Sequence, residues 1–236
     1  MELQNIFFIC YLLISASATL SPFYVPFYLT PCPSESEVCL KKSIQDVIPK
    51  LTQGVPEIGI GSLDPLLIKH ADVKLHDGVR TVVTNGIVTG LRKCLVEAAK
   101  FDVDKDILDL ELQCNITLRG KYKAYGKILI VWLNGDGYAK IKARNVKITA
   151  RIFFQDEIRN GELYYVAKDL SVTHSYDGTV RSQISNLFKG NQELSDFILN
   201  FLNDNWRQVV EEFGNPIATK LTEMVFQVIK QFFVSI

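Results

Sequence analysis

The sequence predicts an α+β fold in which a highly curved antiparallel β-sheet wraps around a long apolar helix at the C-terminal end of the chain. Hydrophobic and polar residues alternate with a period of two over much of the segment 121–175. The strands implied by this pattern run to about 15 residues, against the usual ~5 to 6. A sheet of that length leaves one long apolar face, and apolar stripes at helical spacing in 194–232 supply the helix that covers it.

The first 18 residues are expected to be a signal peptide. An apolar run at 6–14 is followed by the small residues Ala16-Ser17-Ala18, which resemble a signal-peptidase site. The run is too short to cross a bilayer. We therefore expect a secreted protein whose residues 19–236 form a single domain, with no stable membrane insertion.

An amphipathic helix is expected to open this domain. Ser34 and Glu37 have the spacing of a helix capping box. Apolar residues at helical spacing follow, namely Leu40, Ile44, Val47, Ile48 and Leu51. The helix should end near Gly54, because 55–66 is rich in Gly and Pro.

The alternation of charged residues predicts which strand positions face inward. Lys121, Lys123 and Lys127 place odd positions in water. The inward positions are then Tyr122, Ala124, Ile128, Ile130 and Trp132. A turn is expected at Asn134-Gly135-Asp136-Gly137.

The returning strand changes parity between Arg144 and Lys147, which predicts a β-bulge near Asn145. Asn160-Gly161 is a hairpin signal, and 163–175 is expected to be the next strand.

Two helices are expected at the C-terminal end. The first carries an apolar stripe from Leu194 to Phe213. Asn215 suits an N-cap and Pro216 a first helical position, so a second helix should begin there. About 20 residues of helix would span ~30 Å, which matches the sheet.

Four cysteines remain after the signal peptide, so two disulfides can form. Cys32 and Cys39 flank the predicted helix start. Cys94 and Cys114 would lie opposite each other if a hairpin turned at 102–106. The alternative for this second pair is two buried free thiols, because a register shift of one residue would separate the sulfurs. Asn115 begins the only N-x-S/T sequon of the mature chain.

No pattern of catalytic residues is evident, so we do not expect an enzyme. The three histidines form no metal-binding motif, and neither G-x-S-x-G nor a phosphate-binding loop is present. Lys plus Arg and Asp plus Glu both number 26. This balance argues against a nucleic-acid partner. We expect a monomer with neither metal nor cofactor.

A sheet rolled around a helix cannot be filled everywhere by side chains, so an elongated apolar slot is expected beside the helix. Each buried CH₂ is worth ~0.8 kcal/mol, and a tail of about 15 carbons offers on the order of 10 kcal/mol before the cost of immobilisation. Such a slot would bind a small hydrophobic ligand.

The sequence resembles the insect takeout and juvenile-hormone-binding group along nearly its whole mature length. The matching pieces, in order, are the Cys32–Cys39 spacing, GVPEIGI at 54–60, LDPL at 63–66, GKY at 120–122, GKIL at 126–129, NGDG at 134–137, NLFKG at 186–190 and NDNW at 203–206.

This resemblance implies a TULIP-like super-roll with an internal hydrophobic tunnel, a Cys32–Cys39 disulfide and a secreted, haemolymph-type carrier without catalysis. The ligand would be a terpenoid such as juvenile hormone, a fatty acid or a quinone. Cys94 and Cys114 are an addition to the usual takeout pattern, and no cysteine follows Cys114, unlike in hormone-binding members proper. The takeout-like branch is therefore favoured.

The apolar faces deduced above provide the candidate ligand-binding residues. They are Ile44, Ile48 and Leu51 on the first helix, Ile128, Ile130 and Trp132 on the sheet, and Trp206, Phe213, Leu221, Val225 and Ile229 near the C-terminus. Tyr122 and Tyr138 could offer a hydroxyl to a ligand head group, but a core or rim position is the better interpretation of each. The rival hypothesis is an extracellular signalling or membrane-surface module with a filled interior, whose receptor or target-cell partner the sequence does not identify.

Overall fold

A computed structural model describes residues 32–33, 36–75, 78–128, 130–159 and 161–235. The predicted signal peptide at 1–18 lies outside these residues. The described elements, in chain order, are α2 (Glu37–Gln53), η1 (Pro56–Ile58), β1 (Leu66–Lys74), β2 (Arg80–Thr89), η3 (Leu91–Lys93), β3 (Leu95–Asp102), β4 (Ile107–Ile128), β5 (Val131–Arg159), β6 (Glu162–Tyr176), β7 (Val180–Ile184), α3 (Gln192–Asp204) and α4 (Trp206–Ser235).

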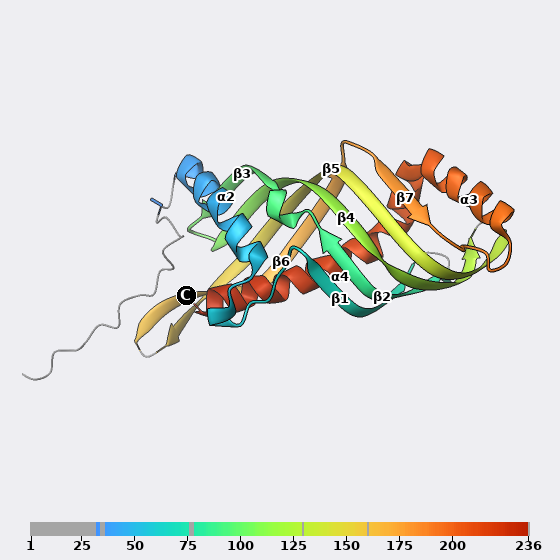
Figure 1. Ribbon diagram of the computed structural model, residues 1–236. Helices are drawn as coiled ribbons and strands as arrows, with labels where there is room; N and C mark the ends of the chain where they lie inside the picture. Colours follow the sequence, from blue (N-terminus) through green and yellow to red (C-terminus); the bar gives the residue numbers. More distant parts are fainter. Residues whose placement is uncertain (1–31, 34–35, 76–77, 129, 160, 236) are drawn as a thin grey trace, which may run out of the picture.

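The seven strands form one antiparallel sheet that curves around α4. Its main order is β1-β2-β4-β5-β6, with β3 pairing one half of β4 and β7 pairing β5. The helix α4 has 30 residues, which corresponds to ~45 Å, and contacts both outer strands, β1 and β6. Helices α2 and α3 lie at opposite ends of the elongated molecule (Figure 1). The predicted α+β super-roll is therefore confirmed.

The first helix begins two residues later than the capping box predicted. Ser36, not Ser34, is the N-cap, and its hydroxyl accepts a hydrogen bond from the Cys39 amide at 3.3 Å. The helix ends at Gln53 with Gly54 as its C-cap, as expected. Both disulfides are present, Cys32–Cys39 at the start of α2 and Cys94–Cys114 between the residue that precedes β3 and strand β4.

The hairpin that joins Cys94 to Cys114 turns where the sequence indicated. Asp102 pairs with Ile107, and Leu95 pairs with Gln113, so the two cysteines come opposite each other. The bulge at Asn145 is also confirmed, because the β4–β5 register shifts there and Asn145 has a φ of 50°. The β5–β6 hairpin at 160–161 is confirmed by the pairing of Arg159 with Glu162.

The prediction for the β4–β5 turn was wrong. The chain reverses between Ile128 and Val131, and 134–137 lies inside β5. The glycines there permit close approach: a Cβ on Gly135 would lie 2.8 Å from the Tyr122 hydroxyl, and one on Gly137 would overlap the carbonyl oxygen of Ser185. This segment has glycines because other chain segments pack against its backbone.

The earlier reversal inverts the parity of the residues that follow it. Ile130 and Trp132 were expected to face inward, yet they are 86% and 75% exposed. Leu133 takes the inward position and is buried. Alternate residues do face opposite sides within each strand. The prediction was wrong because it continued the same alternation through the reversal between Ile128 and Val131, which neither Gly nor Pro marks.

The helix boundary near the C-terminus was also misplaced. Helix α3 ends at Asp204 with Asn205 as its C-cap, and α4 starts at Trp206 and continues through Asn215 and Pro216. Pro216 is inside the helix rather than at its first position. Phe213 and Ile217 on either side of it face the same cavity, so packing against the sheet holds the helix together across the missing N–H.

Side chains fill the two ends of the molecule. At the α3 end, Tyr122, Leu133 and Ile198 belong to one buried cluster. At the α2 end, Ile152 and Phe154 belong to another, against which the last turns of α4 pack. The interior between the two clusters is open, as the next subsection describes.

Candidate functional site

A cavity of about 480 Å³ lies between the concave face of the sheet and α4. Inward-facing side chains of β1, β2, β4, β5, β6 and β7 line it, and so does one face of α4 from Trp206 to Ile229. Almost all are aliphatic or aromatic. This size and lining are typical of a site for a small apolar molecule.

The α4 side of the cavity follows directly from helix geometry. Phe213, Leu221, Val225 and Ile229 are separated by multiples of four, so their side chains fall on one face. Between Phe213 and Ile229 the helix rises ~24 Å. The cavity is therefore elongated along the helix axis.

One polar cluster breaks this apolar lining. His174 and Tyr176 project from the inner face of β6, and Trp206 projects from the start of α4. The His174 and Tyr176 rings meet edge to face with centroids 5.4 Å apart, and the Tyr176 and Trp206 rings do so at 6.5 Å. No described residue forms a hydrogen bond with the His174 ring nitrogens or the Tyr176 hydroxyl.

Burial keeps this cluster uncharged near neutral pH. It lowers the pKa of His174 and raises the pKa of Tyr176, because removal from water disfavours the charged form of each. Since the folded-state pKa of His174 is depressed, the unfolded chain binds its proton first on acidification. The burial of neutral His174 therefore leaves the free energy of unfolding at its full value above about pH 6.5, the ordinary His pKa. The free energy of unfolding falls as the pH drops below that value.

The other ionisable groups at the cavity wall, Tyr122 and Lys220, place no unpaired charge in the cavity. Tyr122 donates a hydrogen bond from its hydroxyl to the Ser185 carbonyl at 2.9 Å. Burial, together with the nearby Asp136, raises the Tyr122 pKa to about 12. Lys220 directs its ammonium to Glu223 at 2.8 Å in an exposed pair. A buried carboxylate would therefore find no cation here.

The structure brings together six of the predicted site residues and leaves the others elsewhere. The six that line the cavity are Tyr122, Trp206, Phe213, Leu221, Val225 and Ile229. Ile44, Ile48 and Leu51 are partly buried on α2 but are not part of the cavity wall. Ile130, Trp132 and Tyr138 are exposed on the outside, and the side chain of Ile128 lies outside the described residues.

His174 and Tyr176 were missed as site residues. The signal was present, since both occupy even positions of an alternating strand in which the even residues Leu170 and Val172 also face inward. Only the curvature of the sheet, which brings β6 over α4, shows that these two side chains face the cavity.

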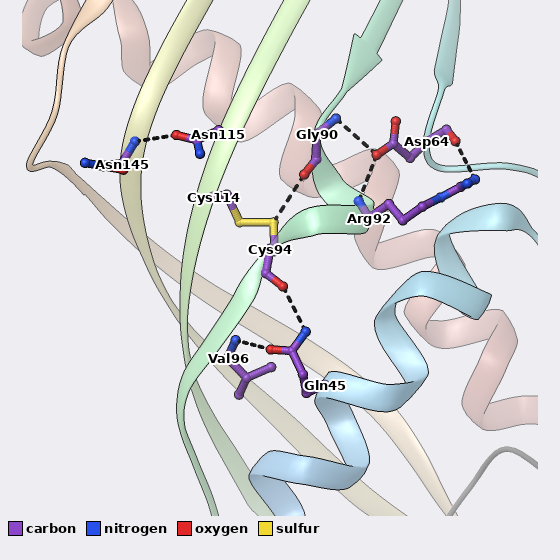
Figure 2. Close-up of a disulfide and its surroundings, with 9 residues drawn as sticks. All are labelled: Gln45, Asp64, Gly90, Arg92, Cys94, Val96, Cys114, Asn115 and Asn145. Carbon is purple, nitrogen blue, oxygen red and sulfur yellow. Dashed lines mark hydrogen bonds between the residues drawn. A yellow bond between two sulfur atoms is a disulfide. The ribbon is translucent and has the colours of Figure 1, made fainter.

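The Cys94–Cys114 disulfide forms part of the cavity wall, and a network of polar contacts surrounds it (Figure 2). The Asp64 carboxylate accepts hydrogen bonds from the amides of Gly90 and Arg92 at 3.1 and 2.8 Å. The side chain of Gln45 donates to the Cys94 carbonyl and accepts from the Val96 amide. Helix α2 is thereby attached to β3 beside the bridge.

The fold and the enclosed apolar cavity define a TULIP-like protein of the class that binds small hydrophobic ligands. Comparisons with known proteins give the family. The chain belongs to the haemolymph juvenile hormone binding protein family, whose model matches residues 8–236.

Solved and curated relatives agree with this assignment. The crystal structure of Takeout 1 from Epiphyas postvittana superposes with a TM-score of 0.82 and 31% identity, covering 87% of this chain and 95% of that one. The circadian clock-controlled protein daywake of Drosophila yakuba is 25% identical over 225 residues, covering 87% of this chain and 83% of daywake. A juvenile hormone-binding protein of Manduca sexta is 28% identical over 90 residues, 37% of this chain and 39% of that protein.

Among the described residues, no helix is both long enough and apolar enough to cross a lipid bilayer. Nor do the described His, Cys, Asp and Glu side chains group into a cluster that could hold a metal ion.

Proposed function

We propose that this protein is a secreted carrier that holds one small hydrophobic ligand between α4 and the sheet. The observation that carries the proposal is the elongated cavity of about 480 Å³ with its nearly continuous apolar lining. In such a cavity most of the binding free energy comes from the removal of the ligand's CH₂ groups from water, which contributes ~0.8 kcal/mol for each group. The rival module without a tightly bound ligand calls for a filled interior, and the cavity argues against it.

The residues proposed to contact the ligand are those of the wall itself. They include Trp206, Phe213, Leu221, Val225 and Ile229 on α4, with Tyr122, His174 and Tyr176 on the sheet. Trp132, Ile130 and Tyr138 are not proposed as ligand contacts, because their side chains face outward.

The polar cluster orients the ligand and selects its head group. A neutral imidazole and a neutral phenol offer hydrogen bonds without charge. An ionised carboxylate would be buried unpaired, which is costly. The ligand is therefore an apolar chain or ring system with an uncharged oxygen function, such as an ester, ketone, quinone or alcohol.

Three further properties belong to the same proposal. Residues 1–18 act as a signal peptide and direct the chain to extracellular fluid. The exposed Asn115 carries a glycan, and its Oδ1 accepts a hydrogen bond from the Asn145 amide at 2.9 Å while Nδ2 stays available for the sugar. The carrier acts as a monomer and catalyses no reaction.

Native mass spectrometry of the full chain, purified from the medium of secreting insect cells, tests the carrier proposal. We expect a complex heavier than the polypeptide by one lipophilic molecule, which organic extraction removes. The extracted protein should then take up the apolar fluorophore diphenylhexatriene. Protein that carries nothing and takes up no fluorophore would contradict the proposal.

Removal of the polar cluster should weaken binding of ligands that have a head group and spare ligands that do not. In His174→Leu/Tyr176→Phe we expect methyl palmitate to displace diphenylhexatriene at about tenfold higher concentration, because two hydrogen bonds of ~0.5–1.5 kcal/mol each are lost. Displacement by hexadecane, which has no polar group, should be unchanged. An equal weakening for both compounds would mean that these side chains only shape the cavity.

A further inference from the structure

Basic side chains are concentrated on one part of the sheet's outer face. We call this region the basic face and define it as Arg119, Lys121, Lys140, Lys142, Arg144 and Arg181, on β4, β5 and β7. All six side chains point away from the cavity, and none has a carboxylate within ion-pair distance among the described residues. Formal charges sum to zero over the whole chain, so this local excess is hidden in the composition.

Strand pairing brings these like charges side by side. Arg119 pairs directly with Lys140 across β4 and β5. Lys142 pairs directly with Arg181 across β5 and β7. Like charges opposite each other destabilise a sheet. This arrangement costs folding free energy, and an anionic surface lying over it would relieve the repulsion.

Exposed aromatic residues occupy the same outer face. Tyr138 pairs with Lys121, and Tyr125 lies on β4 in line with Lys121. Trp132, 75% exposed, projects from β5 on this face, beside the reversal where Ile130 is 86% exposed. Trp and Tyr are the residues that settle at the boundary between lipid head groups and hydrocarbon. A soluble acidic protein would require the charges but not this exposed apolar margin.

We propose that the basic face and its aromatic margin dock the protein on the surface of a membrane rich in anionic lipid. The lysines and arginines contact the head groups, while Trp132 and Ile130 enter the interfacial layer. The outer surface of the sheet thus performs a task separate from the cavity on its inner surface. Docking is peripheral, and it does not depend on whether the cavity is occupied.

Co-sedimentation of the full chain with vesicles tests this directly. We expect binding to mixed phosphatidylserine/phosphatidylcholine vesicles, little binding to pure phosphatidylcholine vesicles, and release at 1 M salt, where the Debye length is about 3 Å. Both vesicle types have the same acyl chains, so uptake of lipid by the cavity cannot produce the difference. The sequon at Asn115 borders this face. All proteins compared in this experiment therefore carry Thr117→Ala, which removes any glycan but keeps the Asn115 side chain.

The variant Lys140→Glu/Lys142→Glu should reduce vesicle binding more than about twentyfold, since each basic residue near an anionic surface is worth ~1 kcal/mol, or about fivefold. Lys69→Glu/Lys168→Glu, with the same charge change on exposed positions of β1 and β6, should reduce it far less.

Vesicles should also shift the tryptophan emission to the blue, and Trp132→Tyr should abolish the shift although Trp206 remains. Equal losses in the two double variants, or binding to soluble polyglutamate but not to the vesicles, would overturn the proposal.

Discussion

Filling the cavity from both sides is expected to abolish ligand uptake without unfolding the protein. Ala143 on β5 and Ala218 on α4 both line the cavity. In Ala143→Phe/Ala218→Phe two aromatic rings take up space that the ligand would use. We expect the affinity for diphenylhexatriene to fall at least about 100-fold, because each displaced CH₂ contact is worth ~0.8 kcal/mol.

Stability should move in the opposite direction to affinity. The added rings contact atoms that now face empty space, so the melting temperature of the unliganded protein should stay constant or rise. Thr149→Phe adds the same ring at an exposed position of β5 and should leave uptake unchanged. A folded double variant that binds the fluorophore like the parent protein would show that the cavity is not the ligand site.

A methyl group at Gly90 is expected to cause the largest loss of stability of any single change considered. Gly90 has a φ of 113°, a conformation that side chains other than glycine's rarely adopt. A Cβ there would overlap the carbonyl oxygen of Asn115 on the neighbouring strand β4. Backbone cannot move aside as a flexible side chain does, so Gly90→Ala should cost at least about 4 kcal/mol.

The position of Gly90 explains why the effect should spread. Its amide is held by the Asp64 carboxylate, and its carbonyl contacts the sulfur of Cys94 (Figure 2). Displacement of this turn therefore disturbs the cavity wall at the disulfide. Gly61→Ala is the matched control, because a Cβ there meets nothing within 4 Å. Urea unfolding of the two variants gives the comparison, and a loss below about 1 kcal/mol for Gly90→Ala would contradict the expectation.

Much of the fold follows from local patterns in the sequence. The spacing of Leu40, Ile44 and Val47 predicted a helix, and α2 contains all three. The parity change near Asn145 predicted a bulge because one extra residue reverses the face of every residue after it. The Cys94–Cys114 bridge followed from the midpoint of a hairpin, although free thiols remained an alternative until the strand register was known.

The errors share a cause, which is that glycine and proline have more than one use. Gly135 and Gly137 were interpreted as turn residues, but they make room for Tyr122 and Ser185. Pro216 was interpreted as a helix start, but packing along the sheet carries α4 through it. In both cases the deciding contact comes from a part of the chain far away in sequence.

The sequence by itself determined the class of fold, the wrapping of a long helix by long strands and the expectation of an apolar interior, because these depend on periodicity and spacing along the chain. Only the tertiary structure decided which residues face the cavity, that His174 and Tyr176 form its polar cluster, and that unpaired cations gather outside. Those properties arise from strand register and sheet curvature, which bring residues from different strands together, and a net charge of zero reports nothing of where the charges lie.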